Sequence, residues 1–326
     1  MHTSSYAAPR WLPGGHLQTI YPALCLKHQF RQTSTLLRRE RWPSPDGDFI
    51  DIDFLDGQAG KPFVIMFHGL EGSSNSHYAR AMFAELKTRG WAGAMPHFRG
   101  CSGELNDAPR FYHSGDAHEI DWLVHALHQR IPQTTPATAL YACGVSLGGN
   151  ALLRWLGSMP ERASIVQAAC AISAPLDLAA GGAALSKGVN LLYTRHFLQT
   201  LKPKCISKLQ QYPGLFDRDA MLAASNLYEF DNVVTAPLHG FKNTNDYWHR
   251  ASAKHVLPHI QVSTLVLNAK NDPFLPAHYL PTQASPAVTL DYPEQGGHVG
   301  FVTGTLPGQL AWLPNKVLNF FTMARQ

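Results

Sequence analysis

The segment Gly144-Val-Ser-Leu-Gly148 is a pattern that could support nucleophilic chemistry at Ser146. In the pattern Gly-x-Ser-x-Gly, the serine lies on a sharp turn between a strand and a helix, and its hydroxyl is exposed. The two glycines fit such a turn, because a Cβ at either position would clash there. Residues 139–143 predict a short buried strand before the serine, and residues 150–156 predict a helix that ends at Gly157. We therefore expect Ser146 to be a nucleophile.

An acid and a histidine follow the serine in the chain. The apolar run 265–267 predicts a strand that leads to Asp272, and 288–290 predicts a strand that leads to His298. A serine hydroxyl is a weak nucleophile until a base accepts its proton, and a carboxylate must orient that base. The order serine, aspartate, histidine is typical of an α/β-hydrolase. We expect Ser146, Asp272 and His298 to form a catalytic triad.

The acid has rivals in Asp231, Asp246 and Asp291. Asp291 lies only seven residues before His298, on or near the same strand, which makes the edge of the imidazole hard to reach. Asp272 ends the preceding strand, so its carboxylate can reach His298. This reasoning favours Asp272.

Residues 68–72, His-Gly-Leu-Glu-Gly, follow an apolar run over 62–67 that predicts a buried parallel strand. An oxyanion hole of this type uses a backbone N–H from such a loop and the N–H after the nucleophile. We expect Leu70 and Leu147 to provide these groups, and His68 to hold the loop by hydrogen bonding. The alternative is a plain turn between strand and helix.

Strand and helix signals alternate from about residue 62 to 172, which predicts an α/β fold with a mostly parallel sheet flanked by helices. The alternating run 49–54 predicts an exposed antiparallel strand. Strand signals vanish over 175–258, where helical and aromatic patterns predict a cap inserted into the fold. The expected organisation is an N-terminal extension (1–45) packed on the core, an α/β-hydrolase core (46–174 and 259–326), and a helical cap (175–258).

Composition narrows the class of protein. The 326 residues are 45% hydrophobic and 15% charged, with a formal net charge of +4 and no long basic stripe, which argues against nucleic-acid binding. No apolar signal-peptide core or run of about 18 apolar residues occurs, so we expect a soluble cytoplasmic protein without a membrane span. Peripheral contact with lipid stays open.

The cysteines and histidines do not form a ligand pattern. The five cysteines are far apart without a CxxC motif, which favours free buried thiols in a reducing compartment. His113, His118, His125 and His128 cluster near a predicted helix over 115–130, but its apolar stripe lies on another face. We expect these histidines on a solvated face, with no metal and no cofactor.

Several longer strings resemble the YheT-like branch of the α/β-hydrolases, which is also related to the yeast medium-chain ester synthases. They are residues 16–20 (HLQTI), 68–79 (HGLEGSSNSHYA), 97–104 (HFRGCSGE), 144–150 (GVSLGGN), 271–274 (NDPF) and 296–301 (GGHVGF). The resemblance covers about residues 9 to 322. It implies a Ser-Asp-His triad at Ser146, Asp272 and His298, carboxylic-ester substrates and no cofactor. Membrane-anchored relatives carry an N-terminal apolar helix that this chain lacks.

The expected function is that of a serine carboxylesterase acting on small-molecule esters with short-to-medium acyl chains. Two alternatives stay open. An alcohol acyltransferase would use the same acyl-enzyme but pass the acyl group to an alcohol, and a non-catalytic hydrolase-fold protein would only bind a ligand.

Overall fold

An eight-stranded sheet forms the centre of the protein, in the order β1-β2-β4-β3-β5-β6-β7-β8. The computed structural model describes residues 6–134, 137 and 139–324. Strands β3 to β8 are parallel to one another, while β2 is antiparallel to both of its neighbours, β1 and β4. The predicted mostly parallel sheet is therefore confirmed. The strands are β1 (Arg38–Pro43), β2 (Phe49–Leu55), β3 (Phe63–Phe67), β4 (Ala92–Pro96), β5 (Leu140–Val145), β6 (Ala168–Ile172), β7 (Ser263–Leu267) and β8 (Val288–Asp291).

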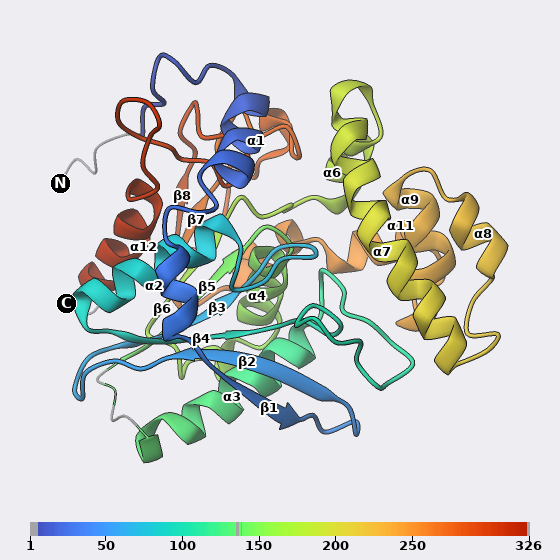
Figure 1. The fold of residues 1–326 in the computed structure, drawn as a ribbon, viewed down its shortest axis with the longest axis horizontal. Coiled ribbons are helices and arrows are strands. Elements are labelled where there is room, and N and C mark those ends of the chain that lie inside the picture. Colours follow the sequence, from blue (N-terminus) through green and yellow to red (C-terminus); the bar gives the residue numbers. More distant parts are fainter. Residues whose placement is uncertain (1–5, 135–136, 138, 325–326) are drawn as a thin grey trace.

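Helices cover both faces of this sheet (Figure 1). Successive side chains of a strand point to opposite faces, so both faces of β3 are apolar. Phe63, Ile65 and Phe67 belong to the core that includes α3 and α4, while Val64 and Met66 belong to the core that includes α2 and α12. The helices of the core are α1 (Gly15–Cys25), α2 (His77–Arg89), α3 (Ala117–Thr134), α4 (Leu147–Ser158), α5 (Pro160–Ala163) and α12 (Trp312–Met323).

Strand β2 is antiparallel as predicted, but the expectation that it is exposed was wrong. Its residues from 50 to 55 are buried, because β1 pairs with it and forms the edge of the sheet. The aspartates that suggested exposure are neutralised from β1: Arg39 lies 2.7 Å from the Asp53 carboxylate, and Arg41 lies 2.8 Å from that of Asp51. An alternating acidic pattern can therefore occur in a buried strand when the neighbouring strand carries arginines.

Gly157 does not end helix α4, which continues to Ser158. A Cβ on Gly157 would overlap the carbonyl oxygen of Val256. The glycine therefore permits close packing between this helix and the segment that precedes β7, rather than terminating the helix.

The segment between β6 and β7 is helical and lies to one side of the sheet, at the right of Figure 1. We call residues 175–258 the cap. Part of it packs around its own apolar cluster, which includes Leu198, Met221 and Phe230. Its helices are α6 (Leu178–Leu185), α7 (Leu191–Gln211), α8 (Arg218–Ala223), α9 (Leu227–Phe230), α10 (Ala236–Leu238) and α11 (Thr244–Ala251), with a π-helical turn at Asp231–Thr235.

Short 3₁₀ turns complete the described chain, at Arg31–Leu36, Gly188–Asn190, Ala253–His255, Leu257–His259 and Ala277–Tyr279. Among the described residues, no helix combines the length and the apolar character that crossing a membrane requires.

Candidate active site

Ser146 lies on the turn between β5 and α4, in a conformation that few residues adopt. Its φ and ψ are 52° and −121°, and a non-glycine residue held there stores backbone strain. A Cβ on Gly144 would overlap the carbonyl oxygen of Gly148, and a Cβ on Gly148 would lie 2.5 Å from that of His68. The glycines therefore allow the tight turn that presents Ser146, for the reason that the sequence suggested.

Three side chains meet at this turn although they are far apart in the sequence. The Nε2 atom of His298 lies 3.0 Å from the Ser146 hydroxyl, and its Nδ1 atom lies 2.8 Å from the Asp272 carboxylate. Asp272 follows β7 and His298 follows β8, so both emerge at the carboxyl ends of adjacent parallel strands. The structure thus brings together the three residues that were expected to form the triad.

The hydrogen bonds around Asp272 fix the state of the imidazole. The other carboxylate oxygen of Asp272 accepts the Phe274 N–H at 2.8 Å. An ionised carboxylate can only accept, so this contact favours a proton on Nδ1 of His298, and in that neutral tautomer Nε2 is the acceptor for the hydroxyl proton of Ser146. The Phe274 ring stacks on the imidazole with 4.0 Å between ring centroids. This arrangement gives His298 the tautomer that a general base requires.

The rival carboxylates have other partners. Asp291 pairs with Lys316 at 2.6 Å, and Asp246 pairs with Arg250 at 3.4 Å. Asp231 lies in the cap, where it accepts a hydrogen bond from Trp248 at 2.8 Å. Within residues 6–134, 137 and 139–324, Asp272 is the carboxylate in contact with His298.

Leu70 and Leu147 both line the cavity beside Ser146. Leu147 is the first residue of α4, and the first N–H groups of a helix have no acceptor within it. The loop that carries Leu70 lies close to the nucleophile, because a Cβ on Gly69 would be 3.1 Å from the Ser146 Cβ. Both residues therefore belong to the wall around the serine.

His68 supports that loop rather than the reacting atoms. It donates from Nδ1 to the Gly69 carbonyl oxygen at 2.7 Å, and its Nε2 accepts the Phe98 N–H at 3.0 Å. Burial lowers the pKa of His68 to about 3, so the imidazole is neutral at ordinary pH. These contacts agree with the holding role that the sequence suggested.

Glu71, next to Leu70, links the same loop to the cap. It has a left-handed φ of 55°, and its N–H donates to the Tyr112 hydroxyl at 2.9 Å, which donates back to the Glu71 carboxylate at 2.9 Å. Lys204 of α7 lies 2.7 Å from that carboxylate. An ion pair between the loop and a cap helix thus fixes the residue that follows the Leu70 amide.

Helix α1 supplies supports that sequence reasoning missed. The Thr19 hydroxyl accepts the His298 N–H at 2.8 Å, and the Gln18 side-chain oxygen accepts the Gly296 N–H and the Asn271 side-chain amide, both at 2.9 Å. The string at residues 16–20 contributed to the family resemblance, yet no role was assigned to it. The sequence did offer a signal for this role, because Gln18 and Thr19 are adjacent polar residues in a largely apolar helix.

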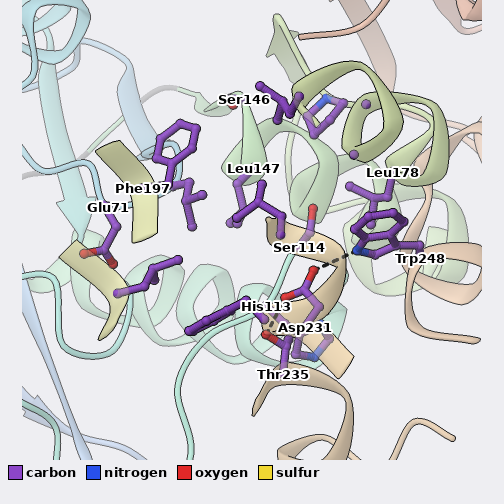
Figure 2. A pocket seen from close by; sticks show the side chains of 18 of the residues that line it. Glu71, His113, Ser114, Ser146, Leu147, Leu178, Phe197, Asp231, Thr235 and Trp248 are labelled. Atoms are coloured by element: carbon purple, nitrogen blue, oxygen red, sulfur yellow. Dashed lines mark hydrogen bonds between the residues drawn. The ribbon is translucent and has the colours of Figure 1, made fainter. Parts of the chain in front are cut away.

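The cavity beside Ser146 has a volume of about 140 Å³ and mostly apolar walls (Figure 2). The cap provides many of them, including Leu178, Leu185, Phe197, Leu201, Leu227, Phe230, Val234 and Leu238. Besides Ser146, Asp272 and His298, the polar groups in the wall include Glu71, Lys204, His113, Asp231, Thr235 and His239.

His113 departs from the expectation of a solvated face. It precedes α3, lies half-buried in the cavity wall and packs against His239 in a tilted arrangement, with 4.4 Å between ring centroids and 54° between the ring planes. His118 and His128, within α3, are exposed as expected. In the described part of the chain, no group of three or more histidine, cysteine, aspartate or glutamate side chains could hold a metal ion.

Comparison with known proteins places this geometry in a family. The sequence model of the protein family described as "alpha/beta hydrolase fold" matches residues 62–305. "Putative esterase YheT" of Escherichia coli is 37% identical, over 94% of this chain and 90% of its own. "Phospholipase ABHD3" of Mus musculus is 28% identical, over 88% of this chain and 71% of its own.

A solved structure shows the same fold. It is the esterase EaEST from Exiguobacterium antarcticum, at 17% identity and a TM-score of 0.54, with 89% of this chain and 100% of that chain covered. The family match, the relatives and the strand order agree, and the chain belongs to the α/β-hydrolase fold family, in its YheT-like branch.

Proposed function

We propose that this protein is a serine carboxylesterase in which Ser146 is the nucleophile, His298 the general base and Asp272 the residue that orients it. The observation that carries the proposal is the chain of contacts from Ser146 through His298 to Asp272, at 3.0 and 2.8 Å. The names of the relatives, an esterase and a phospholipase, support an ester as the substrate.

The reaction follows from the proton positions. Nε2 of His298 accepts the hydroxyl proton as Ser146 Oγ bonds to the ester carbonyl carbon, and Asp272 stabilises the imidazolium. The imidazolium then protonates the departing alcohol, which leaves an acyl-enzyme. Water attacks this acyl group while His298 accepts its proton, and the proton returns to Ser146 as the acid is released.

The Leu70 and Leu147 amides are proposed to donate to the oxyanion. Negative charge develops on the carbonyl oxygen during both steps, and fixed N–H donors stabilise it without reorganisation. Each such donor contributes about 3 kcal/mol to the transition state.

The apolar cavity favours esters with short-to-medium acyl chains, with residues 175–258 acting as the cap over them. Each methylene that enters it should contribute about 0.8 kcal/mol until the space is filled. We expect kcat/KM to rise with chain length across C2 to C12 p-nitrophenyl esters and then to fall sharply. A flat profile would mean that the cavity does not hold the acyl chain.

Fluorophosphonate labelling tests the nucleophile directly. The probe should label the wild-type protein and not Ser146→Ala. Ser114→Ala is a matched control, because Ser114 lines the same cavity but its hydroxyl is bonded to Asn150 rather than to a histidine. Labelling that persists in Ser146→Ala would overturn the proposal. Product analysis in water with and without an added alcohol separates hydrolysis from acyl transfer.

A further inference from the structure

Asp231 is a carboxylate in the cavity wall that the proposed reaction does not use. It begins the π-helical turn Asp231–Thr235 in the cap, and its two oxygens accept the Trp248 indole N–H at 2.8 Å and the Thr235 hydroxyl at 2.6 Å. Figure 2 shows Asp231 and Thr235 well away from Ser146, with Leu147 between them. The carboxylate therefore lies in the part of the cavity that is remote from the nucleophile.

This carboxylate differs from the other acids of the cavity in having no basic side chain as a partner. Glu71 pairs with Lys204, and Asp272 is bonded to His298. Across the described residues, no lysine, arginine or histidine forms an ion pair with Asp231. A carboxylate removed from water without a cationic partner is unfavourable, and such groups are rare.

The histidines nearby do not supply the missing charge. His113 and His239 line the same cavity, and burial lowers the pKa of each to about 3, so both are neutral at ordinary pH. Among the described residues, the wall around Asp231 therefore holds one carboxylate, fastened by two hydrogen bonds, and no charged histidine beside it.

We propose that Asp231 forms a distal subsite for a hydrogen-bond-donating group, an ammonium or a hydroxyl, at the far end of the apolar part of the substrate. The preferred substrates would then be esters whose apolar chain ends in such a group, rather than in a methyl. The inference rests on the proposed function only in placing the substrate in this cavity.

A purely structural role makes a different prediction. If Asp231 serves only to fasten Trp248 and Thr235, then its loss should weaken the fold and leave ligand selectivity unchanged. If it recognises a donor, its loss should change the order in which ligands bind.

Unreactive ligands of equal length test the subsite by isothermal titration calorimetry. The probes are linear amines, primary alcohols and methyl ethers of six, eight and ten heavy atoms, titrated into the full-length protein. In the wild type we expect amines to bind at least about tenfold more tightly than ethers of the same length, because hydrogen bonds to charged groups are strong. Alcohols that also bind better than ethers would show that a hydroxyl is accepted, and alcohols equal to ethers would narrow the subsite to ammonium groups.

Asp231→Asn should bring the ratio of amine to ether affinity close to one. Thr235→Val is the matched control, because it removes one hydrogen bond from Asp231 but keeps the charge, and the ratio should persist. Equal affinities of amine and ether in the wild type, or an unchanged ratio in Asp231→Asn, would overturn the subsite. The wild-type ranking decides the matter even if Asp231→Asn does not fold. Because binding requires no turnover, failure of Ser146 labelling would overturn the proposed function and leave this result standing.

Discussion

Replacement of Asp272 by asparagine tests the proton arrangement more sharply than removal of the nucleophile. The two oxygens of Asp272 accept from two donors, the Phe274 N–H and the His298 Nδ1–H. Asparagine offers one oxygen and one NH₂ group. If its oxygen stays on Phe274, the NH₂ group faces Nδ1, which must then accept, and the proton moves to Nε2, where it blocks acceptance from Ser146.

The magnitude follows from the alternative orientation. Turning the amide so that its oxygen meets Nδ1 places NH₂ against the Phe274 N–H, and an unsatisfied buried donor costs about 1–3 kcal/mol. That cost reduces the productive tautomer roughly 5- to 150-fold at 25 °C. The neutral asparagine also no longer stabilises the positive charge of the imidazolium that forms during the reaction. Together the two effects should lower kcat by about 10⁴-fold.

Steady-state kinetics with p-nitrophenyl butyrate measure this effect. Asp291→Asn is the matched control, since Asp291 pairs with Lys316 rather than with His298. We expect the control to keep wild-type kcat and Asp272→Asn to keep a wild-type melting temperature within a few degrees. An Asp272→Asn enzyme with kcat within tenfold of the wild type would refute the assignment of both the acid and the tautomer.

Three further outcomes are expected. Thr19→Val should lower kcat about tenfold and the free energy of unfolding by about 1–3 kcal/mol in urea titrations, because it leaves the partly buried His298 N–H without its acceptor. Burial lowers the pKa values of His68 and His77 to about 3 and about 4, so the stability these histidines contribute should be present above about pH 6.5 and lost as the pH falls toward 4, as urea titrations at several pH values would show. Burial raises the pKa of Asp231 from 3.8 to about 6, so Asp231→Asn should increase the free energy of unfolding at pH 7.5 by up to about 3 kcal/mol. This increase should shrink as the pH falls from 6 to 4. A decrease in the free energy of unfolding would instead favour a purely structural role for Asp231.

The sequence was sufficient to predict that Ser146, Asp272 and His298 meet, because each of them follows a segment whose pattern predicts a strand. Parallel strands bring their carboxyl ends to one edge, so the order of Ser146, Asp272 and His298 already implied their convergence. No comparable local rule applies to Thr19, whose bond to His298 spans 279 positions. The buried state of β2 was missed for the same reason, since it depends on a partner strand within residues 1–45 that carries arginines rather than apolar residues.

The cap shows why substrate recognition is the harder part to predict. Ser146, Asp272 and His298 lie at strand ends and on loops held by α1, while most of the apolar wall comes from an insertion between β6 and β7. The side chains that an insertion contributes to the cavity can change without moving the strand ends. The sequence motifs that indicate the chemistry therefore carry no information about the ligand. Asp231 illustrates the point. In the sequence it was one of several candidate acids, and only the folded cap shows that it lines the cavity with no ion pair to a cation among the described residues. An unpaired carboxylate in the cavity wall lowers the stability of the fold. Recognition of a hydrogen-bond donor on the substrate, as proposed for Asp231, would account for its presence there.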